Sequence, residues 1–585
     1  MGKKRKKNAT AVTEDRGRHV MHRAIDQGVV FLKNIWGRPR IASTILFVVF
    51  FAIVMTIYAF AEGDPIFDDH YFHLKYAYLL RTEGLNAVNH FDWIYLLSHS
   101  DGGSRYAVSL FQVSLIPFTY FHDWIFALRA LDAFYGGVVI ALMYFLMRKE
   151  HVRHPLFFTL LLVGSSFFVS RMLLGRALVL MIALVFFEMR FAIHRKYVPL
   201  FFVVLIHVLW HQSTYFMPLI IVGMVEFSRY LVEKKVDVKV FVAALGGIIF
   251  GMAFFPGFPG SLFRWLQWIF KIQQSGSASA HGSLGGIEMA TMDLTMNTFG
   301  QSVTVVTMIF CVMAVAYMYH LFREKDADVH EALHAGKMHW LITLMIFTLC
   351  MAGGSFFLTG RLFDFFIPAL VLLLGFVITA LLDTQLIPPR SFGGKGFECS
   401  VWVVVLAMCA YSFSHIYNEA NTFDYRPAQR AAQWIDEHSD DGDKVYLHNW
   451  SYFNLMFFTN AHNKYSMGIE PLTLKAYDES LYWKYYNIFA YKYYCELPKV
   501  CKDELFDELM VKRTDAESRN AFKKENSEKV INAIKNDFGA KIILSNSDVF
   551  TGTIALSPEL IEERYNVQSE KYKGESMHFT VFKLK

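Results

Sequence analysis

Residues 41–73 read IASTILFVVFFAIVMTIYAFA, followed without a break by EGDPIFDDHYFH. The first part of this stretch is apolar over about 20 residues, enough for a helix to cross the ~30 Å hydrocarbon core of a bilayer. A basic cluster, KKRKK at 3–7, and a polar stretch precede it, and no small-residue cleavage site ends it. We therefore expect a retained first span rather than a cleaved signal, with the basic N-terminal segment 1–40 in the cytoplasm.

The composition is that of a membrane protein. Of the 585 residues, 54% are hydrophobic and only 19% are charged, whereas soluble proteins carry about 25% charged residues. This excludes an ordinary soluble enzyme, a disordered chain and a small disulfide-stapled scaffold. The 57 Lys and Arg residues against 52 Asp and Glu residues leave a net charge of +5, too small to indicate a nucleic-acid partner.

Further apolar segments follow the first and define a membrane domain, 41–420. They lie at 123–147, 155–170, 173–193, 198–212, 214–230, 238–256, 299–321, 339–358, 362–384 and 400–420, which with the first predicts about 11 spans. The turns that would be cytoplasmic all carry Lys or Arg, whereas the opposite turns hold at most an isolated Arg. The predicted fold is mainly α, a polytopic transmembrane helical bundle, with loops 62–106 and 257–298 and all of 421–585 outside the cytoplasm.

The polar regions have their own patterns. Within loop 62–106, the spacing of Leu74, Tyr78 and Leu79 predicts a helix over 70–82. Residues 421–585 predict an extracytoplasmic α/β domain, with helices at 431–438 and 530–538 and strands at 444–448, 540–545 and 578–584. Cys495 and Cys501 of this domain are either a disulfide, which an extracytoplasmic location permits, or two free thiols.

The acidic segment after the first span is the strongest candidate for chemistry. It packs Glu62, Asp64, Asp68, Asp69, His70 and His73 against the outer membrane face, where carboxylates are costly unless solvated, paired or metal-bound. Asp69 and His73 are four residues apart and share one face of a helix. Such a pair can bind a hard divalent cation or hold a reacting hydroxyl. The alternative is a solvated helix start, where Asp68 and Asp69 only cap the helix.

Arginines at the outer ends of spans are candidates for binding a lipid phosphate. Arg361 opens one predicted span, and Arg171 and Arg176 flank the junction of two others. An Arg at this depth needs an anion. The alternatives are a local pair of Arg361 with Asp364, three residues on, and extension of the other two side chains to lipid headgroups.

His207 and His211 stand four residues apart near the outer end of a span. Zinc can bind such a pair, but no Cys or acid is close in sequence and the HExxH pattern is absent. We therefore interpret these histidines as hydrogen-bonding groups. Phosphate-binding glycine loops and the Rossmann fingerprint are also missing from the sequence, which gives nucleotide-driven chemistry no support.

The order of these features resembles the C-type superfamily of membrane glycosyltransferases (GT-C). The segment DHYFHLK at 69–75 is similar to the Asp-x-x-x-His pattern of a bacterial branch. At the start of the outer domain, HNWSYF at 448–453 resembles the Trp-Trp-Asp-Tyr-Gly motif of oligosaccharyltransferase catalytic subunits. Trp450 and Tyr452 match this motif, but Ser451 replaces its Asp. That departure puts recognition of a peptide sequon in doubt.

The resemblance implies a GT-C-like fold and a set of roles. Asp69 is the first choice for the catalytic base, with Asp68 second, His73 as its partner and Asp64 as a further acid. Trp450, Tyr452 and Glu288 of loop 257–298 are implied to bind the acceptor, although a solvated loop acid is the ordinary interpretation of Glu288. If a metal takes part, the resemblance implies Mg²⁺ or Mn²⁺ held by Asp69, Asp68 and Glu288.

The function so predicted is transfer of a sugar or glycan from a polyprenyl-phosphate or polyprenyl-diphosphate carrier to an extracytoplasmic acceptor. The expected partners are the lipid-linked donor, a protein or glycolipid acceptor and membrane lipids, in a bacterial or archaeal plasma membrane. One alternative is a non-catalytic receptor or assembly subunit, which the change at Ser451 favours. The other is a transporter of lipid-linked sugars, which would need ionisable groups at mid-membrane and a two-fold repeat.

Overall fold

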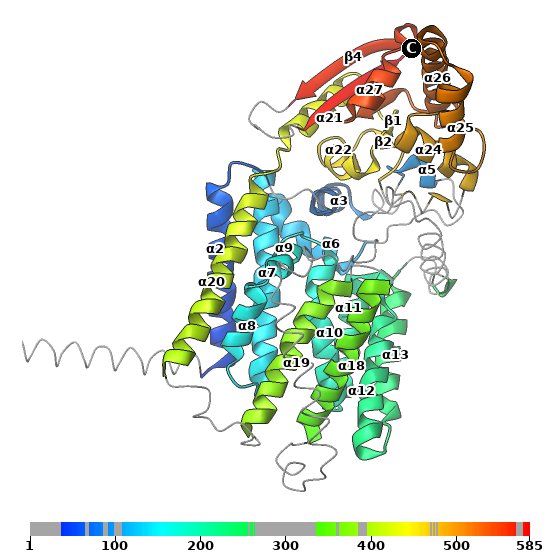
Figure 1. Ribbon diagram of the computed structural model, residues 1–585. Coiled ribbons are helices and arrows are strands. Elements are labelled where there is room, and N and C mark those ends of the chain that lie inside the picture. The colour runs from blue at the N-terminus through cyan, green and yellow to red at the C-terminus, as the bar shows by residue number, and fades with distance from the viewer. Residues whose placement is uncertain are drawn as a thin grey trace, which may run out of the picture.

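A bundle of helices carries a separate α/β domain at one end (Figure 1). The computed structural model describes residues 37–64, 69–85, 92–98, 108–255, 258–260, 263, 335–357, 362–383, 395–468, 471, 474–475, 478–568 and 577–585. We call the end of the bundle next to the α/β domain the domain side. Both parts of the predicted fold class, the helical membrane bundle and the C-terminal α/β domain, are confirmed.

The bundle is built from the predicted apolar segments. Its helices are α2 (Pro39–Phe60), α7 (Trp124–Lys149), α8 (Pro155–Val163), α9 (Ser166–Met172), α10 (Ala177–Ile193), α11 (Tyr197–Trp210), α12 (Met217–Glu233), α13 (Val238–Ala253), α18 (Ala335–Phe357), α19 (Phe363–Asp383) and α20 (Lys395–Ala420). Each predicted segment corresponds to one of these helices or to the α8–α9 pair. The exception is 299–321, which lies outside the described residues.

Not every segment is a full-length span. Among the described residues, six helices are long and apolar enough to cross a membrane, or seven spans if the α8–α9 pair, bent by 79°, counts as one. Helix α11 has only 14 residues because the polar sequence HQST (211–214) ends it. Apolar runs therefore located the helices correctly, but they did not show which helices are short or broken.

Burial separates the centre of the bundle from its rim. Helix α19 is 83% buried over its most apolar window, whereas α2 and α20 are 28% and 22% buried. In Figure 1, α2 and α20 lie together along one edge of the bundle. Their exposed apolar side chains are those that a lipid phase would cover.

Charged side chains gather at the end of the bundle away from the α/β domain. The ion pairs there are Glu150–Arg190, Glu150–His194, Arg153–Asp383, Lys337–Asp383, Arg195–Glu233 and His339–Glu233. The described turns that were predicted to share one side of the membrane therefore meet at one end. Which side of the membrane this end faces stays a prediction.

A layer of short helices lies on the domain side of the bundle. It contains α3 (His70–Glu83), α5 (Tyr95–Ser98), α6 (Leu110–Leu115) and the 3-10 turn η1 (Ile116–Tyr120). Helix α3 confirms the helix predicted over 70–82, and it packs between the bundle and the α/β domain (Figure 1). Helix α3 therefore contacts both the bundle, through α7, and the α/β domain, through α22 (Phe453–Thr459).

The α/β domain holds one five-stranded sheet in the order β2-β1-β3-β5-β4. The strands are β1 (Lys444–Leu447), β2 (Lys464–Tyr465), β3 (Ile542–Ser545), β4 (Ile561–Gln568) and β5 (His578–Leu584). Strand β1 is parallel to β2 and β3, whereas β5 is antiparallel to β3 and β4. The three predicted strands are confirmed, and β2 and β4 were not predicted.

Helices surround this sheet. They are α21 (Arg426–Glu437), α22 (Phe453–Thr459), α24 (Glu479–Tyr491), α25 (Lys502–Phe506), α26 (Ala516–Asn536) and α27 (Asp548–Ile554), with the short turns η4 (Trp450–Tyr452), η5 (Asp507–Lys512) and η6 (Pro558–Leu560). Cys495 and Cys501 form a disulfide after α24. Of the two alternatives for these cysteines, the bonded one is therefore correct.

The first domain-side loop is attached to the edge of the sheet. Ile94 forms a parallel bridge with Tyr465 of β2. The Tyr465 amide donates to the Trp93 carbonyl at 2.6 Å, and the Trp93 indole donates to the Ala461 carbonyl at 2.8 Å. The loop thus extends the sheet by one short strand-like segment and fixes the α/β domain above the bundle.

Candidate active site

Asp69 lies at the N-terminal end of α3, between the bundle and the α/β domain. Asn454 of α22 donates through Nδ2 to Asp69 Oδ1 at 2.9 Å. Arg176, at the start of α10, places Nε 3.4 Å from Asp69 Oδ2. The Asp69 side chain is still 48% exposed. The α/β domain and the bundle thus each contribute one contact to the Asp69 carboxylate, which stays open to solvent.

The segment that resembles the acceptor motif leads directly to Asn454. Its turn η4 is closed by Asn449, whose Oδ1 accepts from the Ser451 amide at 3.1 Å and the Ser451 hydroxyl at 2.8 Å. Tyr452 accepts at its hydroxyl from Asn546 Nδ2 at 3.0 Å. Helix α22, which carries Asn454, starts at the next residue. The two segments singled out by resemblance therefore meet in space.

The position of η4 in the sheet is one where α/β proteins bind ligands. The chain leaves β1 for β2 on one side and later returns to β3 on the other, so the strand order reverses at β1. Trp450 and Tyr452 follow the carboxyl end of β1, and Asn546 follows that of β3. The crevice outside the carboxyl ends at such a reversal is the usual ligand site of open α/β sheets.

His73 lies one helical turn after Asp69 and is held by Gln112. The Ser109 amide donates to Gln112 Oε1 at 2.9 Å, which turns the Gln112 amide nitrogen towards His73 Nδ1 at 3.3 Å. Nδ1 must then accept, which requires a neutral ring. Burial lowers the pKa of His73 to about 4, although the nearby Asp69 carboxylate opposes this effect. His73 is thus a neutral neighbour of Asp69.

A buried pair next to Asp69 was not predicted from the sequence. His70 Nδ1 lies 3.1 Å from Asp132 Oδ1, and both side chains are fully buried. His70 was noted only as part of the polar segment, and Asp132 sits inside a long apolar run. An ionisable residue within a predicted span was the signal available for it.

Asp64 links the end of the first apolar helix, α2, to the chain that enters the α/β domain. Its Oδ2 accepts from the Tyr425 amide at 2.8 Å, and its own amide donates to the Phe423 carbonyl at 2.9 Å. Burial raises the pKa of the Asp64 carboxyl, against the lowering effects of the Tyr425 amide and Arg129. The geometry gives Asp64 a linking role, and its chemical role stays a prediction.

Arg171 is engaged by Asp364. Arg171 Nε and Nη2 donate to Asp364 Oδ1 and Oδ2, both at 2.8 Å, with Asp364 almost fully buried. A local pair of Asp364 with Arg361 was the alternative to phosphate binding by Arg361, and Arg361 lies outside the described residues. Because Arg171 already has a bidentate carboxylate, Arg176 is the described arginine better placed for a phosphate near Asp69.

The predicted metal site is described only in part, since Asp68 and Glu288 lie outside the described residues. Among the residues that the structure does describe, no three His, Cys, Asp or Glu side chains are grouped to hold a metal. Both oxygens of Asp69 face nitrogen donors, from Asn454 and Arg176. The metal-binding role of Asp69, Asp68 and Glu288 stays a prediction.

His207 pairs with an acid that is distant in sequence. Its Nδ1 lies 2.6 Å from Glu188 Oε1, with both side chains fully buried, and its Nε2 lies 3.1 Å from the Thr214 hydroxyl. His211 instead contacts the Ser213 hydroxyl at 3.0 Å. The two histidines thus have separate hydrogen-bond partners, as interpreted from the sequence.

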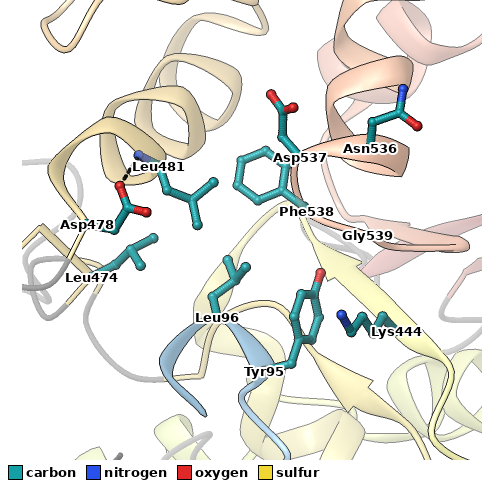
Figure 2. A pocket seen from close by; sticks show the side chains of 10 residues that line it. All are labelled: Tyr95, Leu96, Lys444, Leu474, Asp478, Leu481, Asn536, Asp537, Phe538 and Gly539. Atoms are coloured by element: carbon teal, nitrogen blue, oxygen red, sulfur yellow. Dashed lines mark hydrogen bonds between the residues drawn. The ribbon is translucent and has the colours of Figure 1, made fainter. Parts of the chain in front are cut away.

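A cavity of about 380 Å³ lies away from these residues, between α5 and the outer domain (Figure 2). Its lining residues are Tyr95, Leu96, Lys444, Leu474, Asp478, Leu481, Asn536, Asp537, Phe538 and Gly539. Asp478 is used to cap α24 through the Leu481 amide at 2.8 Å, as Figure 2 shows. The predicted site residues do not line this cavity.

Comparison with known proteins gives limited help. No family model matches the chain, and the search of curated proteins gives no match. Among solved structures, the chain is similar to the crystal structure of ArnT from Cupriavidus metallidurans in the apo state, at 12% identity and a TM-score of 0.48. The match covers 92% of this chain and 98% of that one. The function of this chain must therefore be inferred from its own residues.

Proposed function

We propose that this protein is a GT-C-type membrane glycosyltransferase that moves a sugar or glycan from a polyprenyl-linked phosphate or diphosphate to an acceptor on the domain side of the membrane. We further propose that the domain side is extracytoplasmic, because the basic turns lie at the opposite end of the bundle. The acceptor is a protein, a glycolipid or a polysaccharide lipid.

One observation carries the proposal: the hydrogen bond of 2.9 Å between Asn454 and Asp69. Asn454 directly follows the segment 448–453 that resembles an acceptor motif, so this bond brings the candidate base next to that segment. A lipid carrier presents its phosphate at the membrane surface, and the acceptor arrives from solvent. The half-exposed Asp69 carboxylate lies between the bundle and the α/β domain, where a donor from the membrane and an acceptor from solvent can meet.

The described residues supply the parts that the reaction needs. The Asp69 carboxylate takes the proton from the acceptor hydroxyl or amide as the acceptor atom bonds to the anomeric carbon. The bond from that carbon to the carrier phosphate breaks, and the phosphate oxygen keeps the electron pair. Arg176 stabilises this negative charge, because its guanidinium has five N–H donors and can bind Asp69 and a phosphate together.

Positive charge from Arg176 is the better-supported source of electrostatic stabilisation. A divalent cation, Mg²⁺ or Mn²⁺, held by Asp69, Asp68 and Glu288, would be a second source of positive charge for the same step. Neutral His73 assists by packing beside Asp69 rather than by carrying charge.

The test is a turnover assay. Purified protein in lipid receives polyprenyl-phosphate or polyprenyl-diphosphate sugars with Mg²⁺, Mn²⁺ or EDTA, together with an acceptor extract, and released carrier phosphate is counted. We expect release with one donor class and a loss of about 100-fold or more in Asp69→Asn. Arg176→Gln should also slow release, and Arg176→Lys should slow it less.

A matched control comes from the same loop. Asp92 is a half-exposed carboxylate that pairs with Lys464, and such surface pairs contribute about 1 kcal/mol or less. Asp92→Asn should therefore keep turnover. Undiminished release in Asp69→Asn, or no release with any donor from a folded protein, would refute the proposal and favour the receptor interpretation.

A further inference from the structure

We propose that the buried pair of His70 and Asp132, covered by Gly175, is a positioning device that sets Asp69 against Arg176. This inference rests on the proposed function, because it assigns the pair a task in that reaction. His70 and Asp132 act through Asp69 and do not touch substrate, so they are positioning residues.

The pair ties the start of α3 to the bundle. Asp132 belongs to the third turn of α7, and His70 is the first residue of α3. Their contact of 3.1 Å joins two side chains with no exposed surface. Among the described residues, His70 Nε2 and Asp132 Oδ2 have no further hydrogen-bond partner. The directional contact of each side chain is thus with the other.

Gly175 closes over this pair from the link between α9 and α10. A Cβ at Gly175 would lie 2.6 Å from Asp132 Oδ1 and 2.6 Å from the His70 Cβ. Its φ is +56°, a conformation in which a side chain would also be strained. Only glycine lets the backbone of this link approach the pair so closely.

Two neighbouring residues at the start of α3 contact two neighbouring residues that directly precede α10. His70 packs against Gly175, and its neighbour Asp69 meets the neighbour of Gly175, Arg176. A helix that moves by one residue turns by about 100° and rises about 1.5 Å. Any such shift of α3 would separate Asp69 from Arg176, and the buried pair beneath prevents it.

Stability alone does not account for a buried ion-pairing group here. Replacing a buried pair by apolar side chains of similar size is often neutral or stabilising, whereas removing one partner is strongly destabilising. Apolar residues, however, pack without a preferred direction, and a hydrogen-bonded pair fixes both orientation and register. Changing both residues at once to apolar ones can therefore separate a contribution to stability from a role in positioning α3.

The experiment compares paired substitutions in the full-length protein in lipid. His70→Leu with Asp132→Val should leave thermal stability near that of wild type. It should lower kcat for carrier-phosphate release by about 100-fold with little change in the donor KM, because a displacement near 1 Å is enough for such a loss. The single variant His70→Asn, whose amide can still donate to the unchanged Asp132, should keep most of the wild-type rate.

The bundle offers a matched control. Glu188 of α10 and His207 of α11 form another fully buried His–carboxylate pair, at 2.6 Å. Glu188→Leu with His207→Leu should leave kcat near that of wild type. Equal losses from both double variants, or a wild-type kcat in the 70/132 variant, would overturn the inference.

A second measurement does not depend on turnover. In Asp69→Cys, the guanidinium of Arg176 should lower the pKa of the new thiol below the ordinary value of about 8.5. The pH dependence of alkylation, followed on the peptide containing residue 69, reports this pKa. Combining Asp69→Cys with His70→Leu and Asp132→Val should return the thiol pKa towards about 8.5. Combining it with Glu188→Leu and His207→Leu should leave the thiol pKa low.

The two measurements distinguish the possible failures. If wild-type protein releases no carrier phosphate but the thiol pKa responds to the 70/132 pair, the proposed function fails and the positioning role stands. If wild type is active and the thiol pKa ignores the 70/132 pair, the proposed function stands and the positioning role is refuted.

Discussion

Protonating His73 should lower the stability of the folded protein more than protonating an exposed histidine would. Gln112 cannot turn to accommodate it, because its Oε1 is already used by the Ser109 amide at 2.9 Å. A protonated His73 would then direct an N–H at the Gln112 amide nitrogen, 3.3 Å away. Burial lowers the pKa of His73 to about 4 in the folded protein, in agreement with this geometry.

The size and sign of the effect follow from these values. An unfolded chain binds the His73 proton with a pKa near 6.5, so between about pH 6.5 and pH 4 the unfolded state binds more protons than the folded state. Stability from this group is complete above pH 6.5 and is lost as the pH falls towards 4. At about 1.36 kcal/mol per pH unit, the loss is at most about 3.4 kcal/mol.

The assay compares wild type with His73→Gln, which cannot titrate. Chemical unfolding in detergent micelles, followed by Trp fluorescence at pH 7, 6, 5 and 4, gives the free energy of unfolding of each protein. Other titrating groups cancel in the difference between the two proteins. We expect wild type to lose stability relative to the variant as the pH falls. A constant difference, or one of opposite sign, would refute the neutral-histidine reasoning.

Three further outcomes are expected. Asp364→Ala removes both charge-assisted bonds of Arg171 and should lower the free energy of unfolding by about 3–5 kcal/mol, measured as a fall in Tm. Asn454→Ala should lower kcat about 10-fold, as the loss of one hydrogen bond to the Asp69 carboxylate predicts, and Asn454→Asp should lower it further by repulsion. Because the pKa of Asp64 is raised, its favourable contribution is complete below the ordinary value of 3.8 and is lost as the pH rises. Asp64→Asn should therefore raise Tm relative to wild type at pH 7 but not at pH 3.5.

The sequence predicted the elements whose stability depends on local pattern. Apolar runs located the bundle helices, and alternation located β5 (His578–Leu584) at its observed bounds. Strand β4 was missed because IEERYNVQ is an exposed edge strand with little apolar content. The first half of α26 was missed because AESRNAFKKEN is mostly charged and polar, with no clear apolar face.

The site was predictable only in part, for a different reason. Asp69 stood out because several carboxylates beside a span are unusual, and its proposed role remains a prediction. Its partner Asn454 is 385 residues away and has no chemical feature that marks it. Asp132 was passed over, although an ionisable residue inside a predicted span was a signal for it, because a single polar residue scarcely changes the hydropathy of a span. Partners that tertiary packing selects cannot be found from local sequence.

The attachment of the first loop to the sheet edge has a consequence for biogenesis. The Trp93 indole bonds to a carbonyl 368 residues later in the chain. At about 5–20 residues per second, the ribosome needs about 20–75 s to make that partner. During this interval the loop and Asp69 have been made, but the α/β domain is not yet complete. The contacts of Asp69 and Trp93 with the α/β domain can therefore form only after residues 454–461 have been made, and a nascent chain that stops earlier would lack the Asn454 donor of Asp69.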